Sequence, residues 1–261
     1  MTAAPRLAVA ALLIVIGLYA AVAAYVALNE RSFIFPAPPR GRAPAHAERL
    51  VSLLSGQYFV YLPGDPVVVH FHGNGEDLAD GGGMIDLYRS FGAGVLAVEY
   101  PGYGSSPGVA SERSLYAGAE AALRWLRDEQ HVENVVLSGQ SLGSGVAVEM
   151  ASRGYGSRMI LISPFTSMAS LGQRLFPWLP GALLVRDRFD TLAKAPRVRG
   201  PVLIVHGTRD ELVPFSMGEQ LVHAFPHSAL RPIPGGQHND LLWLHAPEMR
   251  AAIAPFLGSR P

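Results

Sequence analysis

The stretch Val135-Val-Leu-Ser-Gly-Gln-Ser-Leu-Gly-Ser-Gly145 decides the fold of this chain. A short apolar run leads into Gly139-Gln-Ser-Leu-Gly143, and the residues after it have the apolar pattern of a buried helix. The stretch therefore predicts a strand, a tight turn and a helix. A serine on such a turn is held in a strained backbone conformation, and small residues two positions before and after it let the strand and the helix pass closely. We expect the Oγ of Ser141 to lie at the carboxyl end of a sheet, with a helix N-terminus behind it.

Apolar runs alternate with helical patterns on both sides of this turn. Together with Val135–Ser138, the predicted strands are Tyr58–Leu62, Val67–Phe71, Val95–Tyr100, Met159–Ser163, Val202–His206 and Leu230–Ile233. Helical patterns fit Leu78–Phe91, a segment that begins after the N-cap Ser111, Met217–Phe225 and Pro247–Leu257. This alternation predicts the α/β class, with a mostly parallel central sheet and helices on both of its faces. Three successive glycines at 81–83 make the start of the first helix doubtful, because glycine is a poor helix former.

Composition excludes several classes of function. The chain has 261 residues, of which 49% are apolar, so it can bury one large core and is expected to form one globular domain. The 21 basic residues balance the 21 acidic ones and no basic block occurs, so no nucleic-acid partner is expected. Cysteine is absent, which excludes disulfides, thiolate catalysis, palmitoylation and cysteine-ligated metal sites.

The N-terminal segment differs from the rest of the chain. Residues 7–28 carry no charge, and Arg6 and Glu30 bound them. As a helix they would be about 33 Å long, which is enough to cross a bilayer core. The sequence predicts a transmembrane anchor over residues 1–30, and a signal peptide cleaved near Ala21-Val-Ala23 is the alternative. Arginines after the segment favour a cytoplasmic globular domain at a bacterial inner membrane, although the opposite orientation stays open. A proline-rich tether is predicted over residues 31–45 and the globular domain over residues 46–261.

A catalytic role for Ser141 requires two further side chains. A serine hydroxyl is a poor nucleophile at neutral pH, so it needs a base to take its proton and an acid to orient that base. Asp210 follows the strand Val202–His206 and is the predicted acid, with the adjacent Glu211 as the alternative. His238 lies in a glycine-rich loop after the last predicted strand and is the predicted base. The order of serine, acid and histidine, each after a strand, predicts a catalytic triad.

Backbone donors for an oxyanion are also expected at this edge of the sheet. The segment His70-Phe-His-Gly-Asn-Gly75 turns sharply after an early strand, so the N–H of Asn74 can face the serine. The N–H of Leu142, at the start of the helix, is the second predicted donor.

Six motifs together carry a family resemblance, and they cover about residues 45–258. They are His72-Gly-Asn-Gly75, Tyr100-Pro-Gly-Tyr-Gly-Ser105, Gly139-Gln-Ser-Leu-Gly143, Ser163-Pro-Phe-Thr-Ser167, His206-Gly-Thr-Arg-Asp210 and Gly236-Gln-His-Asn-Asp240. The chain resembles the α/β-hydrolase fold and, within it, the membrane-anchored serine hydrolases of the Bem46/ABHD13/ABHD17-like group. The resemblance implies a nucleophilic Ser141, an acidic Asp210, a basic His238, and oxyanion donors at Asn74 and Leu142. The chain departs from some animal relatives because it lacks the cysteines through which those are lipid-anchored, and an apolar helix would replace them.

Other conspicuous side chains have plainer interpretations. His70 and His72 lie two residues apart, but partners at metal-ligand spacing are missing, so no metal and no cofactor are expected. Packing and the shape of the oxyanion loop are the expected roles of these histidines. His206 is expected to be a structural residue at a strand end. Tyr100 and Tyr103 either shape the pocket or are buried loop aromatics.

Residues 164–200, between two predicted strands, form a predicted small cap. The cap is apolar and broken by prolines, so it either covers an acyl-binding groove or simply packs on the sheet. With the anchor at residues 7–28, this predicts a membrane-anchored serine hydrolase that cleaves carboxylic esters or thioesters, including lipid or acyl substrates, through an acyl-enzyme. An aminopeptidase-like serine peptidase with the same triad and a non-catalytic membrane-bound binding protein are the alternatives.

Overall fold

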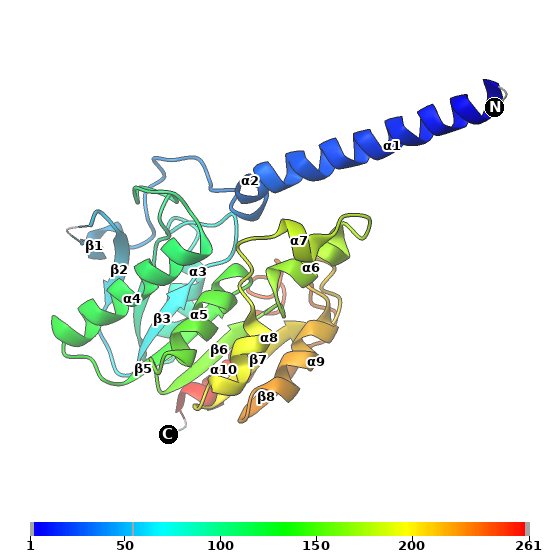
Figure 1. The fold of residues 1–261 in the computed structure, drawn as a ribbon. Coiled ribbons are helices and arrows are strands. Elements are labelled where there is room, and N and C mark those ends of the chain that lie inside the picture. The colour runs from blue at the N-terminus through cyan, green and yellow to red at the C-terminus, as the bar shows by residue number, and fades with distance from the viewer. Residues whose placement is uncertain (1–2, 54, 259–261) are drawn as a thin grey trace.

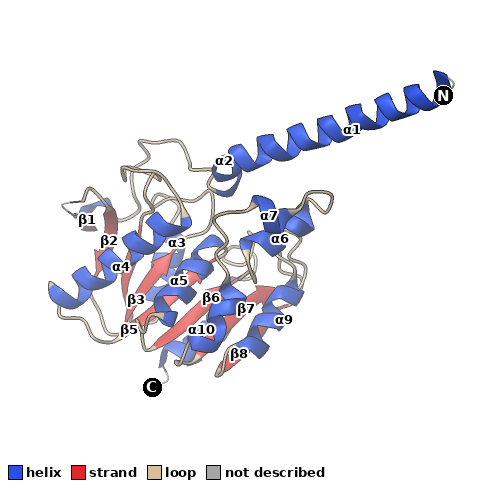
Figure 2. Cartoon of the chain, viewed as in Figure 1, coloured by secondary structure: helices blue, strands red, loops and turns tan. Residues whose placement is uncertain are grey.

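A mixed sheet forms the middle layer of the computed structural model, which describes residues 3–53 and 55–258. Within these residues the sheet has eight strands in the order β1-β2-β4-β3-β5-β6-β7-β8 (Figures 1 and 2). Their bounds are β1 Leu50–Ser52, β2 Tyr58–Leu62, β3 Val67–Phe71, β4 Gly94–Val98, β5 Val135–Gln140, β6 Arg158–Ile162, β7 Val202–Gly207 and β8 Ser228–Ile233. The strands from β4 to β8 pair in parallel, and β1 and β2 pair antiparallel at one edge.

The central strands are apolar along their whole length because helices cover both faces of the sheet. Every residue of β3, β4, β6 and β7 is buried. A parallel strand that is covered on both faces has no solvent-facing positions, so its sequence is a continuous apolar run and not an alternation. This confirms the predicted fold class, and the predicted strands differ from the observed ones only at their ends.

Two groups of helices make the outer layers. One face carries α4 (Glu112–Asp128), α5 (Leu142–Ser152), α8 (Thr191–Lys194) and α9 (Phe215–Ala224), and the other carries α3 (Gly82–Arg89) and α10 (Ala246–Gly258). The alternate side chains of each strand divide between the two cores: Val67 and Val69 of β3 pack under α4 and α5, whereas Val68 packs under α3.

The start of each helix depends on how its first backbone N–H groups are satisfied. Ser111 caps α4 as predicted: its Oγ accepts the N–H of Ser114, and the Ser114 Oγ accepts the N–H of Ser111. By contrast, α3 begins four residues later than the predicted Leu78, at Gly82, and no side chain caps it. The predicted start was wrong because the glycines at 81–83 give the segment little helix propensity of its own.

The N-terminal helix α1 (Ala3–Leu28) projects away from the globular part (Figure 1). Its residues Arg6–Leu28 have a mean hydropathy of 2.7 and are long and apolar enough to cross a membrane. A one-turn helix, α2 (Glu30–Ile34), follows directly, and Ile34 and Phe35 are buried in the main core. The chain is therefore already packed against the globular part before it reaches the prolines at 36–39.

The cap region, residues 164–200, folds into α6 (Met168–Leu175), α7 (Gly181–Leu184), α8 and a 3-10 turn at Ala195–Arg197. The α6–α7 pair lies at the carboxyl end of the sheet, on the same side as α2 (Figure 1). This arrangement places the cap and the N-terminal junction next to the turn that carries Ser141.

Candidate active site

Ser141 lies between β5 and α5 with φ 48° and ψ −114°, a backbone conformation that residues other than glycine rarely adopt. The two glycines of the turn make the necessary close approaches. A Cβ on Gly143 would lie 2.0 Å from the carbonyl oxygen of Phe71 at the end of β3, and one on Gly139 would lie 2.2 Å from the carbonyl oxygen of Gly143. Strand, turn and helix therefore meet at distances that only glycine permits.

His238 lies within hydrogen-bond distance of both other predicted triad residues. His238 Nε2 is 2.9 Å from Ser141 Oγ, and His238 Nδ1 is 2.7 Å from Asp210 Oδ2. Asp210 comes from the loop after β7 and His238 from the loop after β8, so the parallel sheet brings both to the edge where β5 ends. When the Nδ1–H of His238 donates to Asp210, Nε2 carries no proton, and the imidazole can accept the serine proton there.

Asp210 is held as a carboxylate. Its Oδ1 accepts the N–H groups of Leu212 at 3.0 Å and Val213 at 2.7 Å. Burial raises the pKa of Asp210, but hydrogen bonds from His206 and His238 outweigh burial and hold the pKa well below its ordinary value. The adjacent Glu211 is exposed to solvent and has no such partners among the described residues.

His206 lies at the end of β7, as predicted, and its ring also contacts the loop that carries Asp210. Its buried ring donates from Nε2 to the carbonyl of Val213 at 2.9 Å, and the same nitrogen is 3.4 Å from Asp210 Oδ2. The ring thus fixes the loop that presents the acid. The signal in the sequence was its position, four residues before Asp210 in the same motif.

Asn74 and Leu142, the two predicted oxyanion donors, line the same cavity as Ser141. Leu142 is the first residue of α5, and the N–H groups of a first helical turn have no partner inside the helix. Within residues 3–53 and 55–258, the Asn74 N–H makes no hydrogen bond to a protein acceptor. The Asn74 side chain is occupied, because its Oδ1 accepts from Tyr103 at 2.9 Å and its Nδ2 donates to the carbonyl of Ile34 at 2.5 Å.

His72 and Tyr100 support the loop that carries Asn74. The His72 ring is buried between Glu99, which is 3.1 Å from Nε2, and the carbonyl of Gly73, which is 2.9 Å from Nδ1. Burial lowers the pKa of His72, but the hydrogen bond and charge of Glu99 outweigh burial and raise it above its ordinary value. The Tyr100 ring packs on this ring at a tilt of 41°, and its hydroxyl donates to the His72 carbonyl at 2.8 Å.

An apolar cavity of about 390 Å³ opens beside Ser141. Asn74 and Leu142 line it at the catalytic end. Its apolar walls come from the cap, from the α1–α2 junction and from one loop residue: Phe165, Met168, Leu171, Leu175, Phe176, Trp178, Leu179, Val185, Val26, Phe33, Ile34 and Leu212. The junction residues are a part of the site that the sequence did not predict.

A second cavity, of about 590 Å³, lies on the side of His238 and has both apolar and charged side chains in its walls. Its charged and amide residues are Arg42, Asn74, Glu76, Asp80, Gln140 and Asn239. Asn74 lines both cavities, Ser141 lines the apolar one and His238 lines the second.

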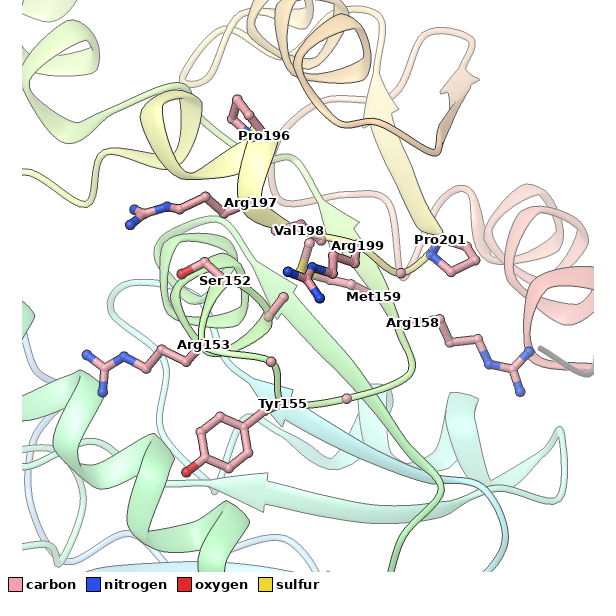
Figure 3. A pocket seen from close by; sticks show the side chains of 14 residues that line it. Ser152, Arg153, Tyr155, Arg158, Met159, Pro196, Arg197, Val198, Arg199 and Pro201 are labelled. Carbon is pink, nitrogen blue, oxygen red and sulfur yellow. The ribbon is translucent and has the colours of Figure 1, made fainter.

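A larger cavity, of about 760 Å³, lies at the opposite end of the sheet, where β6 and β7 begin (Figure 3). Arginines at positions 153, 158, 197 and 199 line it, and it contains none of the triad residues. Cavity size alone therefore does not locate the chemistry in this molecule.

Comparison with known proteins identifies the family. The model of the alpha/beta hydrolase family matches residues 67–194. An uncharacterized protein of Mycobacterium tuberculosis is 36% identical over 213 residues, which cover 78% of this chain and 74% of that protein. The chain belongs to the alpha/beta hydrolase family. The human alpha/beta hydrolase domain-containing protein 17C is 37% identical over 179 residues, which cover 65% of this chain and 52% of that protein. This alpha/beta hydrolase thus spans about half the length of that animal relative.

Solved structures agree with the fold of this alpha/beta hydrolase. The monoacylglycerol lipase of Paleococcus ferrophilus has a TM-score of 0.61 at 23% identity, covering 77% of this chain and 98% of that one. The esterase Pf2001 of Pyrococcus furiosus has a TM-score of 0.67 at 19% identity, covering 85% of this chain and 96% of that one. At these identities the likeness establishes the fold.

Proposed function

We propose that this alpha/beta hydrolase is a membrane-anchored serine hydrolase that cleaves carboxylic esters or thioesters of acyl chains. The observation that carries the proposal is the position of His238, 2.9 Å from Ser141 Oγ and 2.7 Å from Asp210 Oδ2, beside an apolar cavity. A buried serine with a base and an oriented acid is the arrangement that activates a hydroxyl as a nucleophile.

The reaction begins when Ser141 Oγ attacks the acyl carbonyl carbon and His238 Nε2 takes the serine proton. The oxyanion that forms accepts hydrogen bonds from the N–H groups of Asn74 and Leu142. His238 then gives its proton to the leaving alcohol or thiol, and the bond between that group and the acyl carbon breaks. Water then attacks the acyl carbon of the acyl-enzyme while His238 takes a proton from it. The bond between that carbon and Ser141 Oγ breaks, the carboxylic acid is released, and His238 returns the proton to Ser141. Asp210 keeps the imidazole in the required tautomer and stabilises the imidazolium.

The two cavities at the triad support an ester or thioester with unlike halves. The apolar cavity suits an acyl chain, and the cavity lined by Arg42, Glu76 and Asp80 suits a polar leaving group. Asn74 lines both cavities. An ester with one half in each cavity would therefore place its carbonyl oxygen close to the Asn74 N–H.

Membrane anchoring through α1 is part of the proposal. The apolar side chains from Leu7 to Leu28 are mostly exposed and would otherwise face water. We place the domain of residues 46–261 at a bacterial inner membrane, on the cytoplasmic side that the arginine distribution favours.

The test uses the full chain in phospholipid vesicles with p-nitrophenyl esters from acetate to palmitate, an acyl thioester, and an amino-terminal peptide p-nitroanilide. The wild type should hydrolyse esters and thioesters, and Ser141→Ala should lower kcat by about 10⁴-fold or more. Ser152→Ala is the matched control, because Ser152 lies at the far end of the same helix and, among the described residues, its hydroxyl donates to the Glu149 carbonyl alone.

Three results would contradict the proposal. Ester hydrolysis that survives in Ser141→Ala would show that Ser141 is not the nucleophile. Cleavage of the peptide amide at a rate rivalling the esters would favour the peptidase. No turnover of any substrate by the folded protein would favour the binding protein.

A further inference from the structure

We propose that the junction between α1 and α2 is one wall of the acyl site, so that an acyl chain enters it directly from the bilayer in which α1 is anchored. The substrate class is then a long-chain acyl ester or thioester held in that same bilayer. The inference rests on the proposed function and adds the route and the source of the substrate.

The first observation is that one cavity contains both the nucleophile and a residue of the membrane-spanning segment. Ser141 and Leu142 line its inner end. Val26 also lines it, and Val26 belongs to the apolar span Arg6–Leu28. Phe33 and Ile34 of α2 line the part of the cavity contributed by the junction. An acyl chain in this cavity would run from the triad towards the lipid-facing helix without crossing water.

The second observation is that the junction is fixed to the catalytic domain by buried polar contacts. The Glu30 carboxylate is only 6% exposed and accepts the N–H groups of Arg186 at 2.5 Å and Asp187 at 2.9 Å. Arg31 Nε donates to the Asp187 carboxylate at 3.1 Å. A buried carboxylate with two charge-assisted hydrogen bonds resists displacement, because breaking them would leave the charge unpaired. The end of the membrane span is therefore held in register with the cap.

The junction also contacts the oxyanion loop. The carbonyl of Ile34 accepts from Asn74 Nδ2, and Asn74 supplies one of the two proposed oxyanion donors. The segment that links the bilayer to the enzyme is thus in direct contact with the catalytic centre, which a simple tether would not be.

The third observation is that the cap meets the membrane-spanning helix. Tyr19 of α1 donates to the carbonyl of Trp178 at 2.9 Å, and Tyr19 lies about 14 Å along the helix from its end at Leu28. Around Trp178 the cap exposes large apolar side chains: Trp178 is 55%, Phe176 50% and Leu183 83% exposed. Such a group of exposed apolar residues beside a bilayer-crossing helix is typical of a surface that contacts lipid. The open rim of the acyl site would then lie in the acyl layer of the membrane.

The test compares hydrolysis of p-nitrophenyl palmitate and p-nitrophenyl butyrate by the full chain in phosphatidylcholine vesicles. Val26→Trp places a large ring between the lipid-facing helix and the cavity, so the palmitate-to-butyrate ratio of kcat/KM should fall at least tenfold. Each methylene that loses its burial is expected to lower kcat/KM about fourfold. Leu13→Trp is the matched control, because Leu13 is 62% exposed on the same helix and does not line the cavity, and its ratio should equal that of the wild type.

A second measurement on the wild type does not depend on how a variant folds. A long-chain alkyl fluorophosphonate with a terminal diazirine is allowed to react in the vesicles and is then irradiated. Crosslinks are expected on α1, α2 or the lipid. Crosslinks confined to the β8–α10 side of the site, or an unchanged ratio in Val26→Trp, would overturn the bilayer route while leaving the hydrolase intact. Failure of the wild type to hydrolyse either ester would overturn the proposed function, and this inference with it.

Discussion

Replacing Asp210 by asparagine tests the triad through a hydrogen-bond argument that the structure makes specific. Oδ1 of Asp210 accepts two backbone N–H groups, from Leu212 and Val213, so the amide oxygen of an asparagine must occupy that position. The amide NH₂ then takes the place of Oδ2, 2.7 Å from His238 Nδ1, and presents a donor to it. The imidazole can answer only by moving its proton to Nε2, which faces Ser141. It can then no longer accept the serine proton.

The expected loss is about 10⁴-fold in kcat, or about 5.5 kcal/mol of transition-state stabilisation, as for the wrong tautomer in a serine-protease triad. The assay is hydrolysis of p-nitrophenyl butyrate by the full chain, with thermal unfolding measured to verify that the variant is folded. Glu211→Gln is the control, since Glu211 is exposed and adjacent, and its kcat should stay within about twofold of the wild type. Retention of more than a tenth of the activity in Asp210→Asn, together with a large loss in Glu211→Gln, would refute the assignment and make Glu211 the acid.

Three further substitutions probe the turn, a helix cap and a buried histidine. Gly143→Ala forces a Cβ to within 2.0 Å of the Phe71 carbonyl, so the end of β3 must shift; kcat/KM should fall about 10²-fold and the free energy of unfolding by about 1–3 kcal/mol. Ser111→Ala removes the cap of α4 and should lower the free energy of unfolding by about 1 kcal/mol, measured by denaturant titration. Burial lowers the pKa of His70 to about 3, so below the ordinary histidine pKa the unfolded chain binds a proton that the folded chain does not. The wild type should therefore lose about 2 kcal/mol from this residue between about pH 7 and about pH 5, and His70→Phe should not.

Each of these substitutions has its own comparison. Gly258→Ala, at the end of α10, adds a Cβ that meets no heavy atom of another described part of the chain within 4 Å, so it should lower neither activity nor stability, and an equal loss there would contradict the explanation given for Gly143. A Ser111→Ala variant as stable as the wild type would mean that the cap contributes nothing to α4. For His70, equal acid sensitivity of variant and wild type would show that the buried ring is not the group that titrates.

The parts of the fold that sequence predicts are those in which a short stretch determines its own geometry. The stretch around Ser141 specifies a strand, a turn and a helix. The apolar runs on either side give the buried strand and the buried helix, and Gly139 and Gly143 allow the two to approach closely. Once the strands are parallel, the residues after β7 and β8 must reach the edge where β5 ends, so the order of Ser141, Asp210 and His238 in the chain is informative.

The parts that sequence does not predict depend on contacts between distant segments. The first strand, β1, was not predicted because it has only three residues and lies at the edge of the sheet, where its pairing with β2 depends on a neighbour and not on its own pattern. The prolines at 36, 38, 39 and 44 predict a tether over residues 31–45, and Glu30 is expected only to end the apolar segment. Burial of Glu30 depends on backbone donors more than 150 residues away, at 186 and 187, which no local pattern reveals.

Covalent labelling of the nucleophile tests the central claim most directly. The wild type, Ser141→Ala and Ser152→Ala, each as full chain in vesicles, are treated with a fluorophosphonate, and the modified peptide is located by mass spectrometry. We expect a single adduct on Ser141 in the wild type and in Ser152→Ala, and no adduct in Ser141→Ala. An adduct on another residue, or a folded wild-type protein that the reagent does not modify, would contradict that claim.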